Sequence, residues 1–264
     1  MNTLHVVDKL PTTCTDTKIS RRIEVWKETQ QLAPNYPYKP SQKYTYRGTE
    51  ILCKIYNQTR VVIQNIDTLE AAHNLVKIGH NPLILNFADD LDAGGLVDNG
   101  SGAQEESLWR RTNLCMTQTQ TFYPLQQDTT PEAIYTPMAT VFRDTEANDY
   151  AYLSRSWQAS FVALPGLKYP TLNALKEFNK QDKDTLIRKI RLLFQIATKH
   201  HHETLVLGPL GCGAWRCPPS QVAKIFQNEI YNYNGVFHTI VFACMKTPTD
   251  SQDNYKAFCD TFIL

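Results

Sequence analysis

Apolar residues recur in this chain in two patterns, one typical of helices and one typical of buried strands. Over residues 182–201 they repeat at helical spacing with basic residues between them, which predicts a long helix. The continuous apolar runs 82–88 and 204–208 predict buried strands. The other predicted elements are helices over 18–31, 68–79, 220–229 and 254–262, short strands over 133–136, 161–164 and 238–243, and a strand hairpin within 44–64. Strands that alternate with helices predict an α/β fold with a mostly parallel sheet covered on both faces.

Glycine and proline residues mark the ends of several predicted elements. Gly79 is expected to cap the C-terminus of the helix over 68–79. Each of the short strands over 133–136 and 161–164 is expected to end at the proline that follows it. The stretch 35–40 carries two prolines and is expected to form an extended linker.

A glycine-rich loop that leads into two adjacent carboxylates is the first candidate for chemistry. It follows the strand over 82–88 and ends at Gln104, Glu105 and Glu106, which begin a helical pattern. Glycines let the backbone adopt positive φ and approach a ligand closely. Acids also favour a helix N-terminus for electrostatic reasons alone, so a solvated helix face is the alternative interpretation. Because consecutive helical residues point about 100° apart, we expect Glu105 and Glu106 to have different roles.

A second glycine loop, over 208–215, lies between the strand over 204–208 and the helix over 220–229. Free N–H groups near a helix start favour anions, so the segment from Gly211 to Trp215 predicts a phosphate cradle with an aromatic lid. The alternatives are a tight turn without a ligand and a core position for Trp215. Neither loop has the spacing of a dinucleotide fingerprint or of a P-loop.

Composition limits the possible partners and compartment. The chain has 264 residues, 42% of them hydrophobic, and a formal net charge of only +1, which argues against nucleic acid or an anionic membrane as a partner. No apolar run approaches the length of about 20 residues that a membrane helix needs, and the N-terminus has no signal-peptide pattern. Seven irregularly spaced cysteines favour a reducing, cytoplasmic compartment, although delivery into another cell stays open. We expect a monomer.

Two groups of potential metal ligands are not expected to bind metal. The run of histidines at 200–202 ends a helix and has only Glu203 beside it. Cys212 and Cys217 lack the second pair that a zinc site requires, so they are expected to be small buried residues. We therefore predict no metal and no cofactor.

Two blocks of the sequence resemble the microbial-type poly(ADP-ribose) glycohydrolases, which have a macrodomain fold. The family's signature is a strand ending in Asn-Phe-Ala, three glycines, a short spacer and Gln-Glu-Glu. Here the matching residues are Leu85-Asn-Phe-Ala88, Gly94-Gly95 and Gln104-Glu-Glu106. The segment Gly211-Cys-Gly-Ala-Trp215 is similar to the family's diphosphate loop. Leu96 replaces the third glycine and Ala93 replaces the usual proline. The resemblance therefore implies binding of ADP-ribose more strongly than cleavage of poly chains.

The resemblance implies a macrodomain-like three-layer α/β sandwich over 46–264, with an N-terminal helical extension over 1–45. It implies that Glu106 is the catalytic acid and that Glu105 fixes the ribose. Asn86 would bind the distal ribose, and the other ligand-binding residues would be Phe87, Gly94, Gly95, Gln104, Gly211, Cys212, Gly213, Ala214 and Trp215. The substrate would be poly(ADP-ribose) or ADP-ribosylated protein.

The chemistry of such an enzyme sets a condition on its carboxylates. Cleavage of a ribosyl bond needs a group that protonates the leaving oxygen and then deprotonates a water. Glu106 can do both if burial opposes the ionising effect of the helix N-terminus. Two alternatives stay open: a hydrolase for single ADP-ribose units on arginine, glutamate or serine, and a reader that binds ADP-ribose without cleaving it. The retention of both glutamates argues against a reader.

Overall fold

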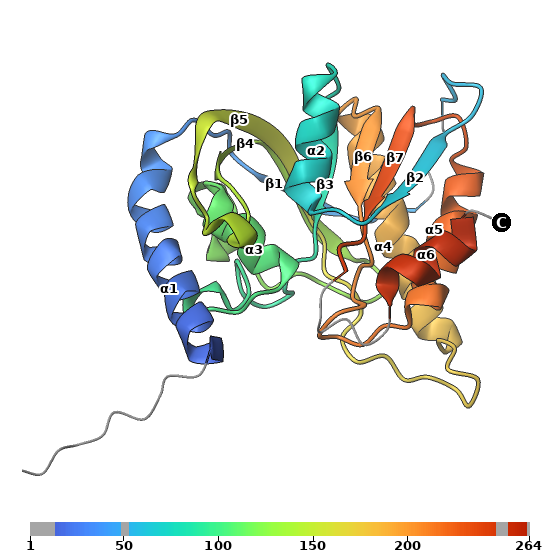
Figure 1. The fold of residues 1–264 in the computed structure, drawn as a ribbon. Coiled ribbons are helices and arrows are strands. Elements are labelled where there is room, and N and C mark those ends of the chain that lie inside the picture. Colours follow the sequence, from blue (N-terminus) through green and yellow to red (C-terminus); the bar gives the residue numbers. More distant parts are fainter. Residues whose placement is uncertain (1–13, 49–52, 247–252, 263–264) are drawn as a thin grey trace, which may run out of the picture.

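The structure is a computed structural model that describes residues 14–48, 53–246 and 253–262. Within these residues seven strands form one twisted sheet (Figure 1). In spatial order they are β1 (Gln42–Thr45), β4 (Glu132–Arg143), β5 (Tyr152–Ala163), β3 (Pro82–Asn86), β6 (Thr204–Leu207), β7 (Thr239–Ala243) and β2 (Arg60–Gln64). The five strands from β5 to β2 are parallel, and β4 and β1 are antiparallel to their neighbours. The predicted mostly parallel sheet is confirmed.

Helices cover both faces of the sheet. One face carries α1 (Cys14–Leu32), α2 (Thr68–Lys77) and α3 (Gln104–Arg111), and the other carries α4 (Lys180–Lys199), α5 (Pro219–Asn232) and α6 (Asn254–Phe262). The alternation along β3 shows this directly, because Ile84 packs with the first group and its neighbours Leu83 and Leu85 pack with the second. All three residues are fully buried. The predicted three-layer α/β arrangement is therefore correct.

Local sequence explains the ends of α2. The Asp67 carboxylate caps its N-terminus by accepting hydrogen bonds from the backbone N–H groups of Leu69 and Glu70, at 3.0 and 3.1 Å. At the other end Gly79 has φ +91° and donates its N–H to Val76, as a left-handed C-terminal cap requires. The expected role of Gly79 is confirmed.

Two predictions about strands are wrong. The described residues within 44–64, which are 44–48 and 53–64, do not form a hairpin, because β1 and β2 lie at opposite edges of the sheet and pair with β4 and β7. Alternating apolar residues indicate a strand but do not encode its partner. In addition, β4 does not end before Pro137: its pairing with β5 shifts register between Thr136 and Ala139, so the proline lies in an irregularity inside a 12-residue strand.

The N-terminal helix packs against the glycine loop and α3 (Figure 1). The indole Nε1 of Trp26 donates to Asp98 at 2.6 Å, and the hydroxyl of Thr29 donates to the carbonyl oxygen of Arg110 at 2.7 Å. The first contact holds η2 (Val97–Asn99), a single 3₁₀ turn within the loop. β1 lies inside the predicted extension over 1–45 and pairs with β4, and the boundary at residue 45 stays a prediction. No helix in the described ranges combines the length and apolar character needed to cross a membrane.

Candidate active site

The loops that follow β3, β5 and β6 leave the sheet at the same edge. The three strands are adjacent and parallel, with Asn86 opposite Ala163 and Ile84 opposite Val206. A Cβ atom added at Gly208, just after β6, would lie 2.6 Å from the ring of Phe87, just after β3. The two glycine loops predicted from the sequence therefore begin side by side, at the carboxyl ends of strands where ligands bind in open α/β sheets.

The glycine loop after β3 lies directly against the carboxylates of α3. Gly94 and Gly95 have φ of +80° and +59°, a region that glycine adopts readily. A Cβ at Gly95 would lie 2.8 Å from Oε1 of Glu106 and 3.0 Å from Oε2 of Glu105. A Cβ at Gly94 would lie 2.6 Å from the Trp109 ring. Both positions therefore need glycine for space as well as for conformation.

Glu105 is almost completely buried and has a donor at each oxygen. Its Oε1 accepts from the side-chain amide of Asn86 at 3.2 Å, and its Oε2 accepts from the backbone N–H of Asp89 at 2.7 Å. Burial raises the pKa of Glu105 well above its usual range, the Asp89 hydrogen bond opposes this rise, and the charge of Glu106 adds to it. This carboxyl group joins the end of β3 to the start of α3.

Glu106 is also buried, at 6% exposure, but only one of its oxygens has a donor. Oε1 accepts from the backbone N–H of Leu96 at 3.1 Å, whereas Oε2 has no donor among the described residues. The side-chain oxygen Oδ1 of Asn86 is buried and unpaired in the same way. Leaving a buried acceptor unpaired costs about 1–3 kcal/mol. Two such atoms at one site fit a ligand that brings hydroxyl donors.

Gln104 links α3 to β3. Its side-chain oxygen accepts from the backbone N–H of Phe87 at 2.9 Å, and its side-chain NH₂ group donates to the carbonyl oxygen of Leu85 at 2.8 Å. These two hydrogen bonds satisfy both ends of the amide. The first residue of the Gln-Glu-Glu motif thereby fixes the distance between the helix and the strand that carries Asn86.

The loop after β6 exposes a row of backbone donors. The N–H groups of Gly211, Gly213, Ala214 and Trp215 donate to no acceptor in the part of the chain that the structure covers. Gly213 lies in open space, since a Cβ added there would have no neighbour within 4 Å. Unpaired amides that precede a helix, here α5, favour an anion. Cys212 and Cys217 are both buried, as expected, and the Cys217 thiol donates to the carbonyl oxygen of Leu167 at 3.3 Å.

Trp215 is half-buried and contacts a residue that the sequence did not single out. The Nζ of Lys168 lies 5.0 Å from the centre of the Trp215 ring, and the same ammonium group forms ion pairs with Asp89, at 3.1 Å, and with Asp90. Lys168 therefore connects the loops after β3, β5 and β6. An exposed lysine in a loop carries no sequence signal for such a contact.

Two further residues of the site were missed. Gly166 packs so closely on the second glycine loop that a Cβ there would lie 2.8 Å from the Cα of Gly211. The Pro165-Gly166 pair after a predicted strand could have indicated it. The hydroxyl of Tyr123 is buried without a partner among the residues described here, burial raises the pKa of Tyr123, and the charge of Glu105 adds to that rise. Nothing in the sequence around Tyr123 pointed to this position.

The histidine run at 200–202 lies at the other end of β6 and has structural partners. His202 hydrogen-bonds the Tyr135 hydroxyl at 2.9 Å and the carbonyl oxygen of Asn81 at 3.0 Å. His200 hydrogen-bonds the Tyr44 hydroxyl at 2.8 Å and stacks on Tyr135 with a centroid distance of 3.8 Å. Over the described ranges, no three His, Cys, Asp or Glu side chains form a group that could hold a metal ion.

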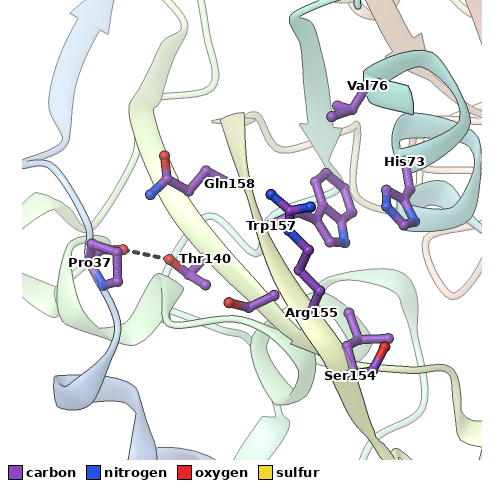
Figure 2. A pocket seen from close by; sticks show the side chains of 10 residues that line it. Pro37, His73, Val76, Thr140, Ser154, Arg155, Trp157 and Gln158 are labelled. Atoms are coloured by element: carbon purple, nitrogen blue, oxygen red, sulfur yellow. Dashed lines mark hydrogen bonds between the residues drawn. The ribbon is translucent and has the colours of Figure 1, made fainter. Parts of the chain in front are cut away.

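A hollow of about 670 Å³ lies elsewhere, between α2 and the N-terminal half of β5 (Figure 2). Its walls include His73, stacked on Trp157 with a centroid distance of 4.9 Å, and the exposed Arg155. None of the site residues predicted from the sequence lines it. The candidate active site is therefore defined by the loops at the carboxyl edge of the sheet.

Comparison with known proteins places the chain among glycohydrolases. A family model described as "Microbial-type PARG, catalytic domain" matches residues 2–144, where PARG denotes poly(ADP-ribose) glycohydrolase. No curated protein matches. The PARG of Thermomonospora curvata is 25% identical, with 92% of this chain and 99% of that chain covered and a TM-score of 0.76. Its complex with the inhibitor ADP-HPD matches with the same coverage and TM-score at 26% identity.

The PARG of Deinococcus radiodurans in complex with ADP-ribose is 22% identical, with 97% of this chain and 98% of that chain covered and a TM-score of 0.66. At that identity the likeness shows the fold alone. The macrodomain-like fold predicted from the sequence is confirmed by these structures. The family match covers more than half of the chain and includes the Gln-Glu-Glu motif. The chain therefore belongs to the family of microbial-type PARG catalytic domains, which are glycohydrolases that act on the ribosyl bonds of poly(ADP-ribose).

Proposed function

We propose that this chain releases ADP-ribose from poly(ADP-ribose) or from ADP-ribosylated protein, with Glu106 as the general acid and base. The family supplies the reaction class. One observation carries the assignment of Glu106: its Oε2 is buried and has no donor in the described part of the chain, whereas both oxygens of Glu105 accept hydrogen bonds. A proton-transfer group needs an oxygen within reach of the substrate, and among the described residues Oε2 of Glu106 is the oxygen of this pair that has no donor from the protein.

The reaction requires two proton transfers at one place. Cleavage of a ribosyl C1″ bond passes through an oxocarbenium-like state, so the leaving oxygen must gain a proton and a water must then lose one. The Leu96 N–H holds Oε1 of Glu106 at 3.1 Å, which fixes the carboxyl group and leaves Oε2 to transfer the proton in both steps. Glu105 is better suited to orienting Asn86, whose unpaired Oδ1 can accept a ribose hydroxyl.

The phosphates are assigned to backbone donors. The unpaired N–H groups of Gly211, Gly213, Ala214 and Trp215 provide several donors for one pyrophosphate group. The related Deinococcus protein was crystallised with ADP-ribose and the Thermomonospora protein with ADP-HPD. We infer that this chain takes the same kind of ligand between its two glycine loops. Trp215 would then cover one side of the bound nucleotide sugar.

A hydrolase for single ADP-ribose units stays the second candidate, on the evidence of Leu96. This residue replaces a family glycine, and it is 57% exposed beside the carboxylates. An isobutyl group at that place changes the surface that meets the acceptor. Substrates with one ADP-ribose unit and with poly chains must therefore be compared.

We also propose that the chain acts as a monomer in a reducing compartment, without nucleic acid or membrane as a partner. The net charge of +1 provides no basic excess, and Cys217 is buried as a free thiol. Sedimentation velocity at two protein concentrations tests the oligomeric state. A concentration-dependent dimer would contradict this part of the proposal.

The main test compares Glu106→Gln with Glu70→Gln, which changes an exposed glutamate on α2 in the same way. Purified protein is incubated with mono- and poly-ADP-ribosylated substrates, and free ADP-ribose is quantified. Loss of a general acid or base typically lowers the rate by about 10²–10⁴-fold. We expect that loss for Glu106→Gln and none for Glu70→Gln. Binding of ADP-ribose by the parent chain without release from any substrate would overturn the proposal in favour of a reader.

A further inference from the structure

Lys189 of α4 is a buried cation for which the reaction described above has no use. Its side chain is fully buried, and its Nζ donates to the carbonyl oxygens of Pro165, at 3.0 Å, and Gly166, at 2.6 Å, and to the side-chain oxygen of Gln127. These three acceptors match the three N–H bonds of an ammonium group. In the described ranges no carboxylate forms an ion pair with it. Because a buried charge without an opposite charge is costly, the presence of Lys189 calls for a reason beyond packing.

The two carbonyl groups that Lys189 binds belong to the loop that packs on Gly211. The peptide bonds of this loop are trans, so the N–H groups of Gly166 and Leu167 point in the direction opposite to the carbonyl groups before them. Those N–H groups therefore point away from Lys189, and neither donates to an acceptor within the described part of the chain. The N–H nitrogen of Leu167 lies near Gly211, 3.4 Å from the position that a Cβ would take there. The unpaired donors of the two loops are thus neighbours.

We propose that Lys189 is a positioning residue for the pyrophosphate group of ADP-ribose. It draws the carbonyl groups of Pro165 and Gly166 beneath their loop, so that the amides of Gly166 and Leu167 extend the row of donors formed by the Gly211 loop. Its positive charge also lies behind these amides, where it attracts an anion without touching it. This inference rests on the proposed function, since it takes ADP-ribose to be the ligand.

The arrangement suits a protein that has no excess of surface cations. The net charge is only +1, and Lys168, an exposed lysine beside Trp215, is already paired with Asp89 and Asp90. An exposed charge is screened by water and salt, whereas a charge behind buried amides is screened much less. One buried ammonium group can therefore favour a pyrophosphate dianion more than a surface lysine would.

The charge on Lys189 depends on pH near neutrality. Burial lowers the pKa of Lys189 to about 7, and the charges that face it oppose or reinforce this shift. Asp90, Asp128 and the Cys217 thiol raise the pKa, whereas Lys168 lowers it. As the pH rises through this range the ammonium group loses its charge and one of its three N–H donors. The affinity for ADP-ribose should fall in the same interval.

The experiment compares Lys189→Met and Lys189→Arg in the full chain with Arg188→Met as the matched control. Arg188 is the preceding residue of α4, and its guanidinium donates to Thr185 rather than to the loop. Calorimetric titration with ADP-ribose at pH 6.5 should show binding by Lys189→Met weakened by at least about tenfold, or about 1.4 kcal/mol. Arg188→Met should bind like the parent chain. Lys189→Met binding within about twofold of the parent at this pH would overturn the inference.

The pH profile separates positioning by charge from simple filling of space. Between pH 6 and pH 9 the parent should lose about tenfold more affinity than Lys189→Arg, because the guanidinium does not lose its proton in this range. The buried Glu105 is present in both proteins, so its own titration cancels in the comparison. If thermal unfolding shows that Lys189→Met is not folded, the comparison of the parent with Lys189→Arg is sufficient to test the inference. The same pH dependence of affinity in these two proteins would refute it. If the parent binds no ADP-ribose at all, it is the proposed function that fails.

Discussion

Gly95→Ala tests most directly whether activity depends on the close packing of the glycine loop against the carboxylates of Glu105 and Glu106. The substitution adds one Cβ atom in a region of backbone conformation that side chains rarely adopt, since φ is +59°. That atom would lie 2.8 Å from Oε1 of Glu106 and 3.0 Å from Oε2 of Glu105. Cβ atoms essentially never approach another atom to 2.8 Å, and 3.0 Å is unusually close, so either the loop or the carboxylates must move.

The expected cost has two separate parts. A left-handed conformation costs a residue other than glycine about 1–2 kcal/mol, and a domain of this size loses about 2–4 °C of melting temperature per kcal/mol. The second part falls on activity alone. A displacement of a reacting group by about 1 Å can lower the rate by about 10²-fold, and Glu106 is one of the two groups that the new atom pushes. We therefore expect a small loss of stability and a fall in kcat of about 10²-fold.

Gly100→Ala provides the matched control. Its φ is +74°, and a Cβ there would lie 2.8 Å from the carbonyl oxygen of Ile19 in α1, away from the carboxylates. The two variants therefore share the conformational cost but displace different neighbours. Release of ADP-ribose from poly(ADP-ribose) and thermal unfolding are measured for both. If the two variants lose activity equally, or if Gly95→Ala keeps full activity, the placement of the loop against Glu106 is not what matters.

Two further predictions concern the same loop and its carboxylates. Leu96→Gly restores the family's third glycine, but Leu96 already has φ −100° and is mostly exposed, so kcat/KM on poly(ADP-ribose) should change by less than about threefold. The added chain entropy should lower the stability by about 0.5–1 kcal/mol. A tenfold gain in kcat/KM would mean that the Leu96 side chain obstructs the substrate. Burial raises the pKa of Glu105 in the folded state, so its contribution to stability is fully present below the pKa of the unfolded chain and is lost as the pH rises through the folded pKa. The melting temperature of Glu105→Gln should therefore rise relative to that of the parent as the pH increases from 5 to 8. A difference in melting temperature that stays constant over this range would contradict the raised pKa of Glu105.

The sequence was informative where chemistry depends on neighbours along the chain. The glycine loop, the Gln-Glu-Glu start of α3 and the second glycine loop were all predicted, because strand, turn and helix signals occur within a few residues of one another. The same local signals could not assign partners to strands. Val61 and Ile63 indicated β2 correctly, but nothing near them shows that β2 pairs with β7, whose residues lie almost 180 positions later.

The residues that were missed depend on contacts between distant segments. Lys189 meets the Gly166 loop from 23 residues away, and Lys168 meets Asp89 across 79 positions of the sequence. In the sequence both are ordinary lysines, one on a helix and one in a loop. Charges of this kind acquire a role only when the fold places them beside backbone groups or carboxylates, so composition and spacing could not identify them.

The structure also bears on a conflict that the sequence left open for the two glutamates. A helix N-terminus favours ionised carboxylates, whereas burial favours protonated ones. At Glu105 burial is the largest influence on the pKa, and it outweighs the hydrogen bond from the Asp89 N–H. Both oxygens of Glu105 nevertheless accept hydrogen bonds from the protein, whereas Oε2 of Glu106 has no donor among the described residues. Under the proposed function the motif needs two glutamates for different reasons. Glu105 links the strand, the loop and the helix through its hydrogen bonds, and Oε2 of Glu106, which has no donor among the described residues, is the oxygen assigned to proton transfer.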